Sequence, residues 1–294
     1  MRTENPIPLP AVPNPTLSTP SLVPRMAVAW ICACLAFLSL PAWAKSDSVF
    51  LEDLTWTEVR DVIHAGKTTV IIPVGGTEQS GPHMALGKHN VRAKFLAGKI
   101  AAALGNALVA PVIAYVPEGA ITPPAGHMRF PGTISIPDDA FKAMVDAAAR
   151  SLKQGVFTDV VLIGDHGGYQ IQLKAVAARL NKDWAAATAA PARAHFIADY
   201  YHAADAEFAQ ALRAKGYTDA QIGKHTGTAD TSLMLAIDAT LVRSDAMHRD
   251  PGAANATGVA GDPRESTAAL GQIGVDLIVA KTVAAIRGAQ GARR

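Results

Sequence analysis

The chain has 294 residues, 49% of them hydrophobic and 18% charged, and its 27 Lys and Arg residues against 25 Asp and Glu residues give a formal net charge of +2. These figures exclude collagen-like, coiled-coil and wholly disordered chains. They also leave no basic surface for nucleic acid, so we expect no nucleic-acid partner.

The N-terminal segment differs in composition from the rest of the chain. Residues 1–25 are rich in proline, and an apolar stretch over 27–40 leads to an A-x-A sequence that ends at Ala44. A basic residue, a short apolar stretch and an A-x-A site are typical of a secretory signal peptide. We therefore expect residues 1–44 to be a proline-rich extension plus signal peptide, and 45–294 to be a mature domain in the periplasm or outside the cell. The apolar stretch is too short to span a bilayer, so no permanent membrane anchor is expected.

Both cysteines of the chain, Cys32 and Cys34, lie inside this apolar stretch. Cleavage after Ala44 would leave a mature protein without cysteine, which excludes thiol nucleophiles, disulfides and Cys-ligated zinc. Met26, directly before the stretch, is an alternative start to Met1, and the sequence leaves that choice open.

Strands and helices alternate along the mature chain. In chain order we predict a short helix opened by a capping box at 55–58, a strand at 68–74, a helix at 93–104, a strand at 107–112, a helix at 141–152, a strand at 159–163, a helix at 170–181 and a strand at 195–199. This alternation predicts a mostly parallel sheet with helices on both faces, in a single three-layer α/β/α domain.

Two polar, glycine-rich clusters follow predicted strands directly. Residues 75–90 follow the strand at 68–74, and residues 164–169 follow the strand at 159–163. In parallel sheets, ligands bind beyond the carboxyl ends of the strands, where such loops lie. Glu, His and Asp side chains supply metal ligands, and glycine lets the backbone approach a ligand closely. A single polar loop residue is usually a surface group, but two such clusters at neighbouring strand ends indicate a site.

Two further stretches belong to the same pattern. His225–Ser232 (HTGTADTS) precedes an apolar run that predicts a helix. Within it, Asp230 or Ser232 is a candidate N-cap, and His225 is a catalytic candidate. His127–Ile134 predicts a turn and strand at the rim of the site.

In this order, the stretches resemble motifs of the creatininase (creatinine amidohydrolase) family. The segments that carry the resemblance are 73–89, 130–133 (FPGT), 164–169, 225–232 and 258–267 (GVAGDPREST). The resemblance covers roughly residues 50–285. It implies a single α/β/α domain, a homo-oligomer, bound divalent metal and hydrolysis of cyclic or linear non-peptide amides.

The same resemblance assigns Glu78 and His166 as metal ligands. His89 stands where the family has a bridging Asp, Ser80 where it has a His ligand, and Gly168 where it has a Glu. A neutral imidazole has one lone pair and cannot bridge two ions as a carboxylate does. We therefore expect one divalent ion per chain (zinc, manganese or iron), held by Glu78, His89 and His166. His83, Asp165 and Asp230 are the alternatives that would restore a second ion.

The resemblance also implies roles in the reaction. His225 is expected to carry a proton to the leaving nitrogen, Glu78 to act at the metal, and the backbone N–H groups of Gly167 and Gly168 to stabilise the oxyanion. The expected reaction is hydrolysis of a small cyclic amide or formamide by metal-activated water. The alternative is a non-catalytic periplasmic protein that binds metal or a small molecule on the same scaffold.

Overall fold

The computed structural model describes residues 47–186, 192–249 and 254–291. The chain divides into a part up to Ala44 and a part from Lys45 to Arg294, and the described residues all belong to the second part. The predicted signal peptide and the two cysteines therefore lie outside the described residues.

The described part of the chain forms one parallel sheet of four strands in the order β2-β1-β3-β4. The strands are β1 (Thr69–Val74), β2 (Ala107–Val109), β3 (Asp159–Gly164) and β4 (Arg193–Phe196). β1 and β3 are buried along their whole length, as strands covered on both faces are. They pair in register up to Val74 and Gly164, so their carboxyl ends lie side by side.

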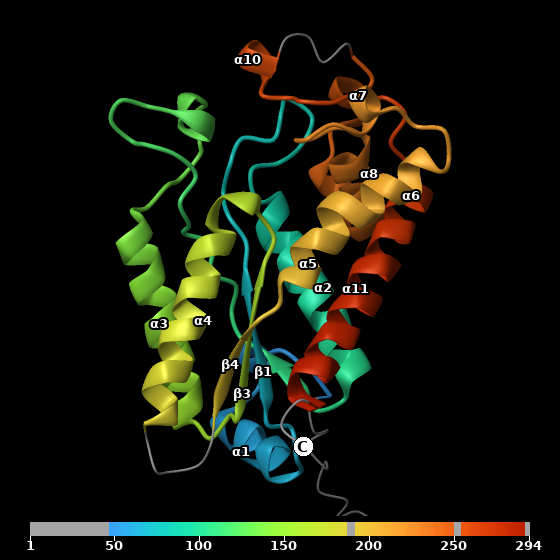
Figure 1. Ribbon diagram of the computed structural model, residues 1–294. Coiled ribbons are helices and arrows are strands. Elements are labelled where there is room, and N and C mark those ends of the chain that lie inside the picture. The colour runs from blue at the N-terminus through green and yellow to red at the C-terminus, as the bar shows by residue number, and fades with distance from the viewer. Residues whose placement is uncertain (1–46, 187–191, 250–253, 292–294) are drawn as a thin grey trace, which may run out of the picture. The chain divides into compact units, whose positions relative to one another are not determined.

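Helices cover both faces of this sheet (Figure 1). The helices on one face are α1 (Trp56–His64), α3 (Asp138–Gln154) and α4 (Gln170–Ala185). The longer helices on the other face are α2 (Lys88–Leu104), α8 (Thr228–Asp238) and α11 (Ala268–Gly291). The shorter helices are α5 (Ala198–His202), α6 (Phe208–Arg213), α7 (Asp219–Ile222), α9 (Ser244–Met247) and α10 (Ala254–Thr257).

The two faces of the sheet have separate hydrophobic cores. Val70 and Ile72 of β1 point into the core under α3 and α4, whereas Ile71 points into the core under α2 and α11. Successive strand side chains alternate between faces, so each strand supplies both cores. This arrangement confirms the predicted α/β class with a parallel sheet between two layers of helices.

Several elements differ from their predicted limits; α3 and α4, for example, extend to Gln154 and Ala185. α2 begins at Lys88, five residues before the predicted start at 93. β2 ends at Val109 because Pro111 has no N–H to continue the ladder. β4 ends at Phe196, and the chain then turns into α5 two residues later.

α11 reaches back along the whole second core. Near its end, the Gln290 side chain donates to Thr69 Oγ1 at the start of β1 (2.9 Å), and Arg287 donates to the Ala103 carbonyl of α2 (2.9 Å).

By length and composition α11 could cross a membrane. However, core helices of soluble proteins pass the same test, and α11 buries Val275, Ile278 and Ile286 in the second core.

Candidate active site

The loops after β1 and β3 meet because the two strands end in register. Tyr169, fully buried below them, links both loops through its hydroxyl. The hydroxyl lies within hydrogen-bond distance of the Val74 and Gly75 carbonyls (2.9 and 2.5 Å) and accepts from the N–H groups of Asp165 and His166 (both 3.1 Å). The polar residues that follow each strand are thereby held in one place.

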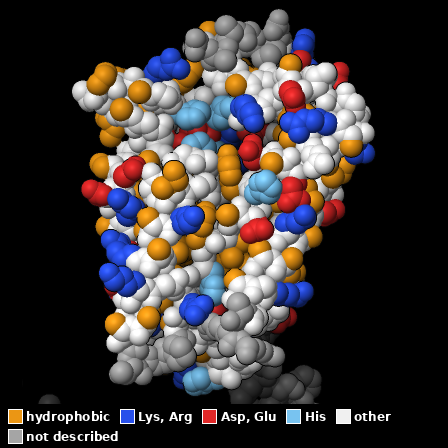
Figure 2. Space-filling view, viewed as in Figure 1, with side chains coloured by type: hydrophobic (Ala, Val, Ile, Leu, Met, Phe, Trp, Pro, Cys, Tyr) orange, Lys and Arg blue, Asp and Glu red, His pale blue; other side chains and the backbone are white. Residues whose placement is uncertain are grey.

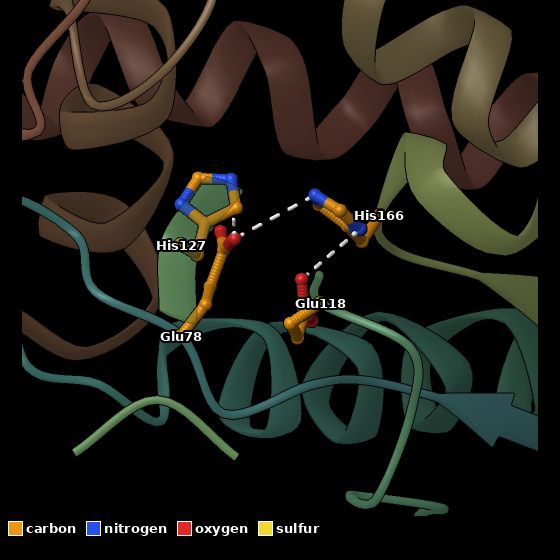
Figure 3. Close-up of side chains that lie close together, drawn as sticks. All are labelled: Glu78, Glu118, His127 and His166. Atoms are coloured by element: carbon orange, nitrogen blue, oxygen red, sulfur yellow. Dashed lines mark ion pairs between the residues drawn. The ribbon is translucent and has the colours of Figure 1, made fainter. Parts of the chain in front are cut away.

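Four side chains converge above these strand ends: Glu78, Glu118, His127 and His166 (Figure 3). Each offers one ligand atom, and these atoms all lie within 4.8 Å of one another. Glu78 Oε2 lies 3.1 Å from His127 Nε2 and 3.6 Å from His166 Nε2, and Glu118 Oε2 lies 3.5 Å from His166 Nδ1. We call this group the four-residue cluster.

Within the cluster, three carboxylate oxygens lack a hydrogen bond, although Glu78 Oε2 lies 3.1 Å from His127 Nε2 and the other oxygen of Glu78 is bonded to His89. Glu78 Oε2 and both carboxylate oxygens of Glu118 are buried without a hydrogen bond to any described residue. A buried carboxylate without compensation costs several kcal/mol. Burial, together with the negative charge of Glu78, accordingly raises the pKa of Glu118 to about 9. A divalent cation would satisfy these oxygens, so the residues present fit a metal ion.

His89 lies beside the cluster but is already engaged by two carboxylates. Its Nε2 lies 2.7 Å from Glu78 Oε1, and its Nδ1 lies 2.6 Å from Asp165 Oδ2. Arg92 Nη2 also lies 3.1 Å from Nδ1, so both ring nitrogens of His89 already have protein partners. The expected ligand set of Glu78, His89 and His166 therefore meets only in part, and Glu118 and His127 stand where His89 was expected.

Two buried cations extend this network away from the cluster. The ammonium of Lys88 lies 3.5 Å from Glu78 Oε1 and 3.1 Å from Asp230 Oδ2. Arg92 donates to Asp165 Oδ2 at 2.7 Å and to Asp230 Oδ1 at 2.6 Å.

The carboxylates of this network lie against basic side chains of the protein. Burial alone would raise the pKa values of Asp165 and Asp230, but Arg92 and its neighbours His89 and Lys88 hold both below their usual range. Three carboxylates, those of Glu78, Asp165 and Asp230, thus lie against Lys88, Arg92 and the imidazole of His89. Asp165 and Asp230 are neutralised by protein groups and lie outside the four-residue cluster.

His83 is likewise engaged elsewhere. Its Nε2 lies 3.0 Å from the Thr231 hydroxyl, and burial lowers its pKa to about 4. Asp230 is also not the N-cap of α8, because Gly227 holds that position. From within the first turn, Asp230 instead accepts from the N–H of Thr226 (2.9 Å).

His225 reaches the site from the loop before α8. An antiparallel bridge to Ala260 fixes its backbone, with the Ala260 N–H donating to the His225 carbonyl at 2.9 Å. Its Nδ1 lies 3.7 Å from Glu78 Oε1. Burial lowers its pKa to about 3, so the ring is neutral at neutral pH in the metal-free protein.

The two glycines expected at the oxyanion differ in their surroundings. The N–H of Gly168 donates to His166 Nδ1 at 3.2 Å, within its own loop. Gly167 lines the cavity, and a Cβ there would lie 2.6 Å from the Tyr201 hydroxyl.

A cavity of about 200 Å³ opens onto the cluster. His127, His166 and His225 line it together with Tyr201 and Lys224. Figure 2 shows the hollow as a group of histidines with acidic and basic side chains beside it.

Glu118 was not identified from the sequence, and His127 was placed only at the rim. One signal could have found Glu118: it is the only charged residue between positions 107 and 126. A lone carboxylate in an apolar, proline-rich stretch that must pack near a strand end is a candidate ligand.

Comparisons with known proteins find relatives along most of the chain. A family model described as creatinine amidohydrolase matches residues 52–286. A mycofactocin precursor peptide peptidase of Mycolicibacterium smegmatis is 28% identical over 225 residues, which are 71% of this chain and 81% of the relative. A creatinine amidohydrolase of Pseudomonas putida is 27% identical over 208 residues, which are 68% of this chain and 76% of the relative.

Among solved structures, a creatininase variant described as a Zn–Zn type superposes with a TM-score of 0.69 at 25% identity. The match covers 83% of this chain and 98% of that one.

Proposed function

Since the chain belongs to the creatininase family and is a hydrolase of carbon–nitrogen bonds, we propose that it hydrolyses a small cyclic amide or formamide by means of one divalent cation. The observation that carries the proposal is the set of unpartnered oxygens on Glu78 and Glu118, beside His166. Carboxylate and imidazole ligands of this kind suit zinc, manganese or iron.

One ion per chain follows from the charges around His89. Lys88, Arg92 and His89 already pair with Glu78 Oε1, Asp165 and Asp230, whereas Glu78 Oε2 and Glu118 keep carboxylate oxygens without a hydrogen bond from the described residues. A second ion beside His89 would meet two buried positive charges at close range.

The reaction needs an activated water and a proton carrier. A bound divalent cation lowers the pKa of water toward ~7 and polarises an amide carbonyl. His225, neutral at this pH, would accept the proton of the attacking water at Nδ1 and deliver it to the leaving nitrogen. Glu78 connects the proton carrier to the proposed metal site, because its Oε1 faces His225 and its Oε2 faces His127 of the four-residue cluster.

The size of the cavity favours a small substrate. A volume of about 200 Å³ suits a single heterocycle, below the range of ~300–1,000 Å³ usual for larger ligands. Cleavage of a peptide is the second candidate, because the Mycolicibacterium relative is described as a peptide peptidase.

Metal analysis and a substrate screen test the proposal together. We expect one equivalent of tightly bound Zn²⁺ or Mn²⁺ per purified chain, and chelator-sensitive hydrolysis within a panel of lactams, cyclic ureas, formamides and short peptides. Two tight equivalents would contradict the single site. Turnover of peptides alone would contradict the small substrate, and tight metal with no turnover at all would support the binding-protein alternative.

The role of His225 has its own test. His225→Ala should lower kcat by ~10²–10⁴ with metal content unchanged, because the proton carrier is lost but the four-residue cluster is not. His64→Ala, an exposed histidine on α1, is the matched control and should leave kcat unchanged. Turnover of His225→Ala within a few-fold of wild type would rule out this role.

Export to the periplasm and assembly into a homo-oligomer complete the proposal. Export rests on the sequence of residues 1–44, and oligomerisation on the family resemblance. Cell fractionation and size-exclusion chromatography with light scattering test the two, and a cytoplasmic monomer would contradict both.

A further inference from the structure

The side chain of Gln79 is fixed by two backbone groups that leave its amide no choice of orientation. Its Oε1 accepts from the N–H of Gly81 (3.0 Å), which can only donate. Its Nε2 donates to the Gly258 carbonyl (3.2 Å), which can only accept. A Cβ at Gly258 would lie 1.9 Å from Gln79 Oε1, so the glycine makes room for the amide.

This amide also faces two histidine rings. Nε2 of Gln79 lies 3.0 Å from His127 Nδ1 and 3.1 Å from His225 Nε2. His225 Nε2 is also 3.0 Å from the backbone carbonyl of Gln79, which only accepts, so that nitrogen carries a hydrogen. The second hydrogen of the Gln79 amide is therefore donated to His127 Nδ1.

The tautomer of His127 follows. Its Nδ1 holds the lone pair and accepts from Gln79, so the hydrogen of the neutral ring is on Nε2. Nε2 is the ring nitrogen that faces Glu78 Oε2, at 3.1 Å. A nitrogen that carries a hydrogen cannot ligate a cation, and metal-bound histidines usually donate their other N–H to an acceptor.

His166 has the opposite arrangement. Its Nδ1 accepts from the N–H of Gly168, so the lone pair is on the nitrogen that faces Glu118 Oε2 at 3.5 Å. Its other nitrogen faces an acceptor, Glu78 Oε2, at 3.6 Å. The lone pair of His166 thus faces a carboxylate of the cluster, whereas the lone pair of His127 faces the Gln79 amide. A cation bound by His166 would displace the Gly168 N–H from Nδ1, whereas a cation bound by His127 would require the other tautomer of its ring.

We propose that His127 is a catalytic hydrogen-bond donor, which presents its Nε2–H to the carbonyl oxygen of the substrate, and that Gln79 is the positioning residue that holds it in this tautomer. The ligands of the cation are then Glu78, Glu118 and His166. The proposal rests on the proposed function. His127 lines the cavity and is a quarter exposed, so its ring borders the space that a substrate would occupy.

Measurements of metal binding test whether His127 is a hydrogen-bond donor or a ligand of the cation. We compare Zn²⁺ content and affinity, by chelator competition, in wild type, His127→Gln, His127→Phe and His166→Gln. His127 variants should keep one equivalent with affinity within about three-fold of wild type, whereas His166→Gln should lose ~100-fold or more, beyond the 10–100-fold typical of outer-shell changes. Loss of Zn²⁺ from the His127 variants to the extent seen in His166→Gln would overturn the proposal.

Kinetic measurements then test whether His127 takes part in the reaction as a hydrogen-bond donor. His127→Phe should lower kcat by ~10²–10³ with KM little changed, as for loss of one oxyanion donor. His127→Gln keeps an N–H at a similar reach and should recover part of that loss. Equal activity of wild type and His127→Phe would also overturn the proposal.

The tautomer itself is measurable in the metal-free protein. In long-range ¹H–¹⁵N correlation spectra, His127 should show a protonated Nε2 and an unprotonated Nδ1. Gln79→Glu replaces the donor by an acceptor and should bring a proton to Nδ1, whereas Gln210→Glu on the exposed side of α6 should change nothing. A wild-type ring protonated at Nδ1 would contradict the proposal. If wild type binds no Zn²⁺, the proposed function fails, while this spectrum still decides the tautomer.

Discussion

Glu78 and Glu118 belong to one cluster but respond oppositely to burial. Burial alone would raise both pKa values, yet Lys88 and His89 hold the pKa of Glu78 well below its usual range. Glu118 has no cation beside it except distant Lys88, and the negative Glu78 raises its pKa further, to about 9. In the metal-free protein, one carboxylate is therefore charged and the other holds a proton at neutral pH.

The proton on Glu118 predicts how stability depends on pH. Above its ordinary pKa of 4.5 the unfolded chain releases this proton, whereas the folded protein keeps it until about pH 9. The free energy of unfolding of the metal-free protein should therefore fall as pH rises through this window, by at most ~1.4 kcal/mol per pH unit.

Urea unfolding of the metal-free protein across this pH range measures the slope. Glu118→Gln cannot titrate and should remove most of it, while Glu265→Gln, an exposed carboxylate, should keep it. Saturating Zn²⁺ should reverse the slope, because the cation replaces the proton. An unchanged slope in Glu118→Gln would show that another group is responsible.

Residues of the site could be predicted where they follow regular strands. Glu78 and His166 come directly after β1 and β3, and parallel pairing places such residues together. Glu118 and His127 lie in the irregular stretch between β2 and α3. Their position depends on long-range bonds such as that from the Ile134 N–H to the Thr77 carbonyl (2.9 Å), which no local pattern reveals.

At the scale of elements, α2 begins earlier than the sequence predicts, and its buried residues explain the difference. The sequence predicts a start at 93, where apolar periodicity begins, but the helix starts at Lys88. Its first turns bury Lys88, His89 and Arg92, which face the site instead of a hydrophobic core. Polar residues at buried positions hide the pattern from which a helix is recognised.

The contact between α8 and α11 depends on a glycine. A Cβ at Gly271 would lie 1.8 Å from the Ser232 carbonyl oxygen of α8, whereas a Cβ at Gly288, on the same helix, would meet nothing within 4 Å. Gly271→Ala should therefore destabilise the protein by ~1–3 kcal/mol through overpacking. Gly288→Ala should be neutral or stabilise by up to ~1 kcal/mol, from helix propensity alone.

Chemical denaturation of the two variants measures this difference directly. Equal denaturation midpoints for Gly271→Ala and Gly288→Ala would contradict the prediction that α8 and α11 are closely packed at Gly271.

At the scale of the molecule, alternation of strands and helices was enough to predict the layers and the parallel sheet. It was not enough to predict the order β2-β1-β3-β4, because strand neighbours are set by tertiary packing of the crossover helices. The N-terminal 44 residues follow a different pattern and carry a prediction of their own.

That prediction is processing after Ala44. Expression of the full chain should yield a periplasmic product whose first residue is Lys45, as read by intact-mass spectrometry, because signal peptidase requires small residues before the cut. Ala44→Asp should block the cut and leave the precursor. A product that retains residues 1–44 would contradict the predicted signal peptide.

The way α11 closes the second core has a consequence for how the chain is made. Residues near the end of this helix bond to the start of β1 and to α2, which are synthesised some two hundred residues earlier. Until α11 leaves the ribosome, Ile71 and the apolar side of α2 lack part of their cover on that face, although α5, α6 and α8 have already been made. The second core therefore cannot be complete until translation has almost ended, however early the sheet and the first core form.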